Sequence, residues 1–267
     1  MREEMINLTL WQLGAAYVFI LILLAIVRWR KIPREKQILI ATIRMTLQLL
    51  IVGYILMLLF DNPHPLLTIL IVAIMVAFSV RNISSRVRGE LGKPLKRAIL
   101  ISMVAGSVVS LLYFNFIVIQ LSPWYDPQYF IPIAGMIIGN SMTGVTLGVQ
   151  TLLDGMNDQR QKVEAALMLG ASPQAATKKW VNRAFDSAIL PTINKMVGMG
   201  IVFLPGMMTG QILAGASPFI AVEYQIAILL GIIGAVSLTV ILFVNLAYKV
   251  FFNERSQLLH NAMNGKS

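Results

Sequence analysis

The sequence predicts an all-α polytopic membrane protein with about seven transmembrane helices. Its composition is 57% hydrophobic and only 13% charged, with a mean hydropathy of +0.74, which is too apolar for a water-soluble surface. Seven apolar stretches each approach the ~20 helical residues that cross a hydrocarbon core of ~30 Å. The segments between them alternate between strongly basic and nearly free of Lys and Arg.

This alternation predicts the orientation, because basic segments stay on the cytoplasmic side during insertion. Except for Arg2 and Arg44, all of the 22 Lys and Arg fall in segments that would share one side of the membrane. We therefore expect the N-terminus outside and the C-terminus inside, in one transmembrane domain over residues 1–267. The net charge of +10 does not indicate nucleic-acid binding, because the charges form no basic groove or stripe.

The spans are expected, in order, at about 8–27, 38–59, 65–80, 98–120, 130–151, 193–213 and 223–248. The first follows Glu3 and Glu4 and precedes a basic run, the reverse of a cleavable signal peptide, so it is expected to stay as a span. The turn at 61–65 is expected outside and the basic segment 81–97 inside. The next outer turn, 122–127, has the aromatic residues typical of a membrane interface.

The segment at about 152–192 is expected to lie in the cytoplasm, and it is large enough to fold outside the membrane. Residues 158–169 are strong helix formers and Gly170 supplies a stop. Ser172 can cap the next helix, and Pro173 suits its first turn. The segment therefore predicts two cytoplasmic helices joined by a short turn.

Several kinds of chemistry are not expected. The chain has no cysteine, so it can form no disulfide, thiolate metal site or thiol nucleophile. Its two histidines, His64 and His260, have no Ser or Cys partner that the topology would bring near. No complete phosphate-binding loop is present. We therefore expect a chain that is not itself an enzyme and binds no cofactor.

Polar side chains at membrane depth are candidates for a transport pathway, since burying them in lipid is costly. Arg44 would lie ~9 Å inside the second span, where it could snorkel to the interface or face a pathway. Gln48 and Asn140 would lie at one level near the midplane. They could hydrogen-bond each other as ordinary helix contacts or line a polar path.

The fifth and sixth spans concentrate glycine and proline, which permits either close helix packing or a hinge. Pro205 and Gly206 would free backbone carbonyls in mid-membrane that need a partner. The methionines of these spans could bind soft cations or serve as ordinary apolar residues. Outer-side oxygen ligands for a harder cation would be Asp61, Asp126 and Glu223. The pathway candidates are Arg44, Gln48, Asn140, Met142, Pro205, Gly206, Met207, Met208 and Gln211.

The run Glu164-Ala165-Ala166, with Gly170 after it and residues 189–191 further on, resembles the EAA loop of ABC importer permeases. This loop is the helix pair that docks on the ATPase subunit. The spacing from Gly170 to Ile189 is longer than in importers, so a generic amphipathic helix is the alternative interpretation. The resemblance implies ATPase-coupling roles for Glu164, Ala165, Ala166, Gly170, Ser172 and Pro173.

A more extensive resemblance is to the FetB-type permease family, carried by residues 51–54, 131–142, 169–173, 204–210 and 224–226. It implies the permease half of an ABC exporter linked to iron export from bacteria. A separate FetA-like ATPase would bind ATP and Mg. Plant relatives are tied to aluminium tolerance, with a nucleotide sugar proposed as cargo, so the resemblance leaves the cargo open.

Together these observations predict a multi-pass inner-membrane permease that forms a homodimer with two ATPase subunits and exports iron. An ABC permease for another cargo, including an imported small polar solute, is the alternative. A seven-helix retinal protein shares the topology, but no Lys lies in the middle of the last span. A scaffold for membrane assembly remains a further alternative.

Overall fold

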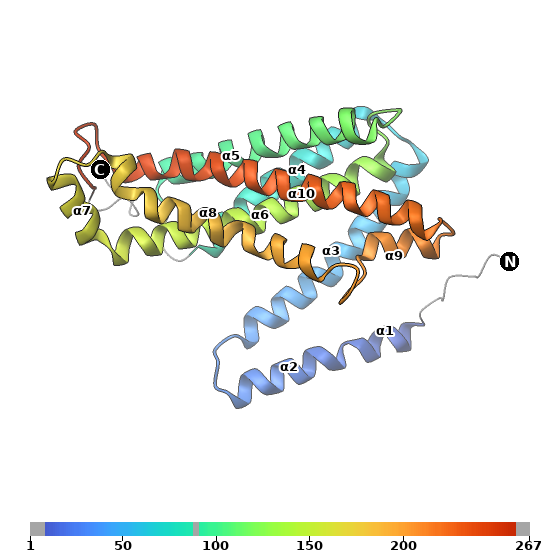
Figure 1. The fold of residues 1–267 in the computed structure, drawn as a ribbon. Helices are drawn as coiled ribbons and strands as arrows, with labels where there is room; N and C mark the ends of the chain where they lie inside the picture. The colour runs from blue at the N-terminus through green and yellow to red at the C-terminus, as the bar shows by residue number, and fades with distance from the viewer. Residues whose placement is uncertain (1–8, 88–90, 260–267) are drawn as a thin grey trace.

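A computed structural model describes residues 9–87 and 91–259, and nearly all of this chain is helical (Figure 1). The long helices lie roughly along one axis, so the molecule has two ends. One end holds α7 and the last described residues, and the other holds α9 and the turn before α10. We call these the α7 end and the α9 end. The elements are α1 (Leu10–Ala16), α2 (Val18–Trp29), α3 (Glu35–Asp61), α4 (Pro65–Arg86), α5 (Lys93–Tyr113), a π-helical turn (Phe114–Ile119), α6 (Pro127–Asp158), α7 (Arg160–Met168), α8 (Pro173–Gly198), α9 (Gly206–Leu213), α10 (Pro218–Ala247) and a 3-10 turn (Tyr248–Phe251).

Side-chain caps and prolines begin several of these helices where the sequence places them. Asp126 accepts a hydrogen bond from the backbone N–H of Gln128 at the start of α6. His64 Nδ1 accepts one from Leu66 at the start of α4. Such caps satisfy backbone donors that have no partner within the helix. The ends of these helices are therefore determined locally.

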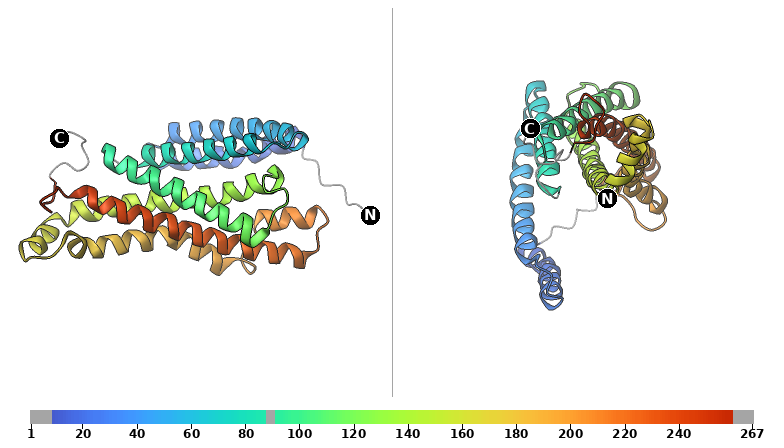
Figure 2. Two further views of the ribbon diagram at one scale, coloured as in Figure 1. Left: turned by 90° about the horizontal axis from the view of Figure 1, so that it is seen from above. Right: turned by 90° about the vertical axis from the view of Figure 1, so that its left-hand side faces the viewer.

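The core forms where α6 and α10 pack against α4, α5 and α8. Close backbone approach makes this packing possible at two glycines of the long helices. A Cβ at Gly144 of α6 would lie 2.8 Å from Val236 Cγ1 of α10, and one at Gly106 of α5 would overlap Thr239 of α10. Helices α1 to α3 stand to one side of this core (Figure 2). The hydroxyl of Tyr17 hydrogen-bonds Thr46 Oγ1 at 2.6 Å, which ties the first helices to α3.

The all-α, multi-pass prediction is confirmed, and six of the seven expected spans are found in the part of the chain that the structure describes. Six stretches are helical, long and apolar enough to cross a membrane: Leu10–Trp29, Glu35–Asp61, Pro65–Arg86, Lys93–Ile119, Pro127–Asp158 and Pro218–Phe251. The predicted span at 193–213 is absent from them. The chain leaves the helix after Gly198, Gly200 adopts a φ of +83°, and a new helix starts only at Gly206.

The segment expected to lie in the cytoplasm, 152–192, holds the end of α6, then α7, and then most of α8. Its second half belongs to α8, which packs along α6 and α10 instead of standing apart. The buried residues Trp180, Ala184, Ala188 and Thr192 recur every fourth position and form one stripe along α8. The charged residues of α8 lie between them on the other faces. The mean hydropathy of the segment is therefore low, although one face of the helix packs in the bundle.

Candidate functional site

The short helix α7 carries the Glu-Ala-Ala run, and it is held at the α7 end by two kinds of contact. Val163 is buried in the core. Arg160 Nε donates to Glu164 Oε1 at 2.8 Å, and Arg160 Nη1 donates to the carbonyl of Leu259 at 3.2 Å. Glu164 thus helps to hold Arg160 on the C-terminal segment, while Ala165 stays exposed.

The turn from α7 to α8 has the geometry that its sequence predicts. Gly170 adopts a φ of +87°, a conformation that favours glycine. Ser172 Oγ accepts a hydrogen bond of 3.2 Å from the N–H of Ala175, and Pro173 is the first residue of α8. Just before this turn, Met168 and Leu169 are 87% and 89% exposed. The corner therefore presents two large apolar side chains at the end of the molecule.

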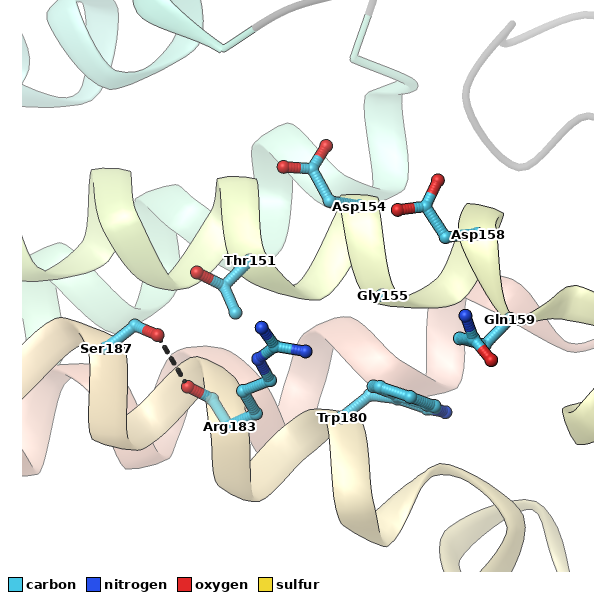
Figure 3. A pocket seen from close by; sticks show the side chains of 8 residues that line it. All are labelled: Thr151, Asp154, Gly155, Asp158, Gln159, Trp180, Arg183 and Ser187. Atoms are coloured by element: carbon cyan, nitrogen blue, oxygen red, sulfur yellow. Dashed lines mark hydrogen bonds between the residues drawn. The ribbon is translucent and has the colours of Figure 1, made fainter.

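A cavity of about 360 Å³ opens between α6 and α8 near this corner. Figure 3 shows Arg183 pointing from α8 toward α6, whereas Asp154 and Asp158 project from α6 one turn apart. Trp180 closes one wall, where a Cβ on Gly155 would lie 3.1 Å from its ring. The lining is charged and polar: Thr151, Asp154, Gly155, Asp158, Gln159, Trp180, Arg183 and Ser187. The i, i+4 spacing of the two aspartates is a signal from which the sequence could have indicated this cavity.

The second part of the site joins α6 to α8 on an exposed face, partway along the length of α6. Lys195 Nζ donates to Asn140 Oδ1 at 2.9 Å, and Asn140 Nδ2 donates to the carbonyl of Met136 at 2.7 Å. Asn140 lies ~20 Å along α6 from Pro127 and ~27 Å from Asp158, at 1.5 Å per residue. Lys195 was expected among the residues of the basic side, so its place beside the middle of α6 is a correction.

The expected pairing of Asn140 with Gln48 is not found. Gln48 is exposed on α3, and the two hydrogen bonds of the Asn140 side chain go to Lys195 and Met136. Arg44, also on α3, places its guanidinium carbon 5.0 Å from the centre of the Phe78 ring of α4. The α3 candidates and Asn140 therefore make their contacts with different neighbours.

The break at Pro205 and Gly206 is real, and its carbonyl has a partner. Thr209 donates to the Pro205 carbonyl through both its N–H and its hydroxyl, each at 3.0 Å. Met207 packs against the core, as does Met142 of α6. Met208 and Gln211 are half-buried in α9. The α9 residues thus form a short helix beside α10, with the break directly before it.

The three outer carboxylates do not form a metal centre. Asp126 caps α6, Asp61 ends α3, and Glu223 borders an apolar groove between α5 and α10. Within residues 9–87 and 91–259, no group of three His, Asp or Glu side chains could hold a metal ion. The structure therefore gives these three residues separate surroundings.

Comparison with known proteins finds one family and several relatives along almost the whole chain. Residues 10–252 match the model described as Uncharacterised protein family (UPF0014). A UPF0014 membrane protein of Synechocystis is 34% identical over 93% of this chain and 94% of its own. The probable iron export permease protein FetB of Escherichia coli is 32% identical over 95% and 96%. The protein ALUMINUM SENSITIVE 3 of Arabidopsis thaliana is 32% identical over 92% and 88%. No solved structure matches.

Proposed function

The chain belongs to the UPF0014 family, and from this membership we propose that it is the permease subunit of an ABC exporter that moves iron across the inner membrane. The main support for the cargo is FetB, a probable iron export permease that is similar over nearly its whole length. In this proposal a separate FetA-like subunit hydrolyses ATP, and this chain supplies the path through the bilayer.

The observation that carries the coupling role is the exposed corner between α7 and α8. Met168 and Leu169 are almost fully exposed, and the charged cavity beside Arg183 opens at the same end. Exposed apolar side chains that lie together beside charged and polar residues can serve as a docking surface for another protein. The ATPase would contact this corner, and its movement would reach α6 and α8 through the residues that join them.

Two permease chains would form the working unit, together with two ATPase subunits. The support is an uncovered face of α6, α8 and α9 that carries small residues. Gly139, Gly206 and Gly210 have no atom within 4 Å of the place a Cβ would take. Small residues let two helices approach closely in a membrane. A twofold axis at this face would place both copies of Asn140 beside a shared route.

A different cargo is the alternative to iron, because one relative is named for aluminium sensitivity. Reconstitution of the chain with its candidate ATPase in liposomes tests both. The expected result is ATP-driven movement of iron, while an aluminium salt or a nucleotide sugar moving in its place would replace iron as cargo. If none of them moves and none stimulates ATP hydrolysis, the exporter proposal is wrong.

The coupling corner is tested by changing both Met168 and Leu169 to Ser. We expect at least a tenfold loss of ATPase binding with an unchanged thermal unfolding midpoint, because the corner makes few contacts in the permease itself. The matched control is Ile32→Ser, in the turn between α2 and α3, where the side chain is 45% exposed. Equal ATPase binding by the double variant and the control would place the coupling surface elsewhere.

The orientation is tested with single cysteines, because the chain has none of its own. Gln174→Cys lies at the α7 end, and Ser217→Cys lies in the turn before α10 at the α9 end. A membrane-impermeant thiol reagent on intact cells should label only the second. Labelling of Gln174→Cys instead would reverse the topology and remove the corner from the cytosolic ATPase.

A further inference from the structure

The Lys195–Asn140 pair leaves hydrogen-bond donors free on an exposed face of α6 and α8. An ammonium group has three donors and a primary amide has two. Lys195 donates one hydrogen bond to Asn140, and Asn140 donates one to the carbonyl of Met136. Among the residues that the structure describes, Lys195 forms no ion pair, since the ion pair found is between Arg160 and Glu164. The pair therefore offers a positive charge and unused N–H groups at one place.

Along α6 and α8, no carboxylate of the described residues lies near that charge. Asp and Glu are absent from residues 36–60, 62–89, 91–125, 127–153 and 187–222. On α8 the nearest is Asp186, ~13 Å toward the α7 end, and on α6 it is Asp154, ~21 Å away, at 1.5 Å per residue. Lys195 lies in the last turn of α8, where the helix dipole compensates only part of a full charge. This stretch of α6 and α8 thus carries a positive charge with no negative charge nearby on the same two helices.

The pair is also reachable. Asn194 and Lys195 are exposed on α8, and Thr143 is exposed on α6. At Gly139, next to Asn140, no atom lies within 4 Å of the place a Cβ would take. The uncovered face of α6 and α8 therefore has room for a ligand group beside the two side chains.

We propose that Lys195 and Asn140 bind an oxyanion of the cargo, a carboxylate or phosphate group carried by the transported molecule or coordinated to the transported metal. The N–H groups of both side chains would donate to its oxygens, and the ammonium would balance its charge. A bare metal cation would meet a positive charge and no carboxylate at this level. The inference rests on the proposed function and names the chemical form in which cargo passes: iron would cross as an anionic complex.

Direct binding to the purified permease, without its ATPase, tests the site. The probes are citrate, ferric citrate, pyrophosphate and chelator-free Fe²⁺ under anaerobic conditions, each measured by equilibrium dialysis. We expect the oxyanions to bind and Fe²⁺ alone to bind at least tenfold more weakly. Binding of citrate only as the ferric complex would assign the site to a metal chelate, and tight binding of pyrophosphate would assign it to a phosphate-bearing molecule.

The variants separate charge from structure. Lys195→Met, similar in length but neutral, should weaken oxyanion binding at least tenfold, and Lys195→Arg should stay within threefold of the wild type. The control Lys249→Met removes a cation beyond the end of α10 and should change nothing. Should Lys195→Met fail to fold, two other measurements test the site. Asn140→Leu should weaken oxyanion binding, and pyrophosphate should compete with citrate for the wild-type protein. The proposed site is wrong if the wild type binds no oxyanion, or if Lys195→Met binds oxyanions as tightly as the wild type does.

The two proposals can fail separately. If the reconstituted complex exports chelator-free Fe²⁺ equally well with Lys195→Met, the oxyanion site is wrong while the permease role stands. If oxyanion binding depends on Lys195 but no cargo couples to ATP hydrolysis, the site stands and the exporter role is wrong.

Discussion

The N-terminal helices and the α5, α6 and α10 bundle are both apolar, yet they differ widely in burial. In the most apolar window of Leu10–Trp29, 6% of the residues are buried, and the value for Glu35–Asp61 is the same. The buried share of the corresponding window of Pro127–Asp158 is 44%, although this span is the least apolar of the three. Apolarity places a helix in the membrane, whereas small residues and close contacts decide whether other helices surround it.

The largest expected effect comes from filling a helix contact in the bundle. Gly144→Leu should prevent recovery of folded protein, because even a Cβ would lie 2.8 Å from Val236 Cγ1 and 3.2 Å from the Ala188 carbonyl. Gly53→Leu in α3 is the matched control, since no atom lies within 4 Å of its Cβ position. Size-exclusion chromatography after purification measures both. A monodisperse Gly144→Leu protein would show that α6 and α10 do not pack as described.

A smaller effect is expected from emptying a core position. Phe243 of α10 is fully buried and Phe19 of α2 is 75% exposed. Phe243→Ala should lower the free energy of unfolding by about 3–5 kcal/mol, because it leaves a cavity. Phe19→Ala should cost less than about 0.5 kcal/mol. Unfolding in mixed micelles, followed by tryptophan fluorescence, measures the free energy of unfolding of both variants. Equal losses of stability would contradict the difference in burial between the two regions.

The smallest expected effect concerns the attachment of the first helices. Tyr17→Phe removes the hydrogen bond to Thr46, which in a membrane contributes about 1 kcal/mol. We expect the free energy of unfolding to fall by no more than about 1 kcal/mol and the distance between α2 and α3 to become more variable. Spin labels on cysteines introduced at Leu21 and Leu50 measure that distance. Tyr54→Phe, on an exposed tyrosine of α3, is the control, and an equally broad distribution there would contradict the assignment.

The helix α8 was predicted to begin at Ser172 and Pro173, but its packing along α6 and α10 was not predicted. Lys178, Lys179, Arg183 and Asp186 make the first half of α8 read as a cytoplasmic segment. The stripe from Trp180 to Thr192 was nevertheless present at intervals of four residues, and a search for helical periodicity would have found it. The break after Gly198 was only half predicted, since Pro205 and Gly206 were recognised but the non-helical residues before them were not.

The Lys195–Asn140 contact is of a different kind, because its partners are 55 residues apart. Counting residues from the ends of the predicted spans placed Asn140 at the same depth as Gln48. Such a count does not show which helices face one another. Only the packing of α6 against α8 brings Lys195 to Asn140. The pairing of Lys195 with Asn140 therefore could not be predicted from the sequence alone.

By itself, the sequence determined that this chain is helical, apolar and multi-pass, and where several of its helices begin. These features are local: in hydrocarbon each backbone group needs a partner within its own helix, and a cap needs only its neighbours. The tertiary structure decided which helices form the centre, where the chain breaks between α8 and α9, and which polar side chains meet. Those depend on the relative register of helices, which is set by side-chain volumes at contacts such as Gly144 with Val236.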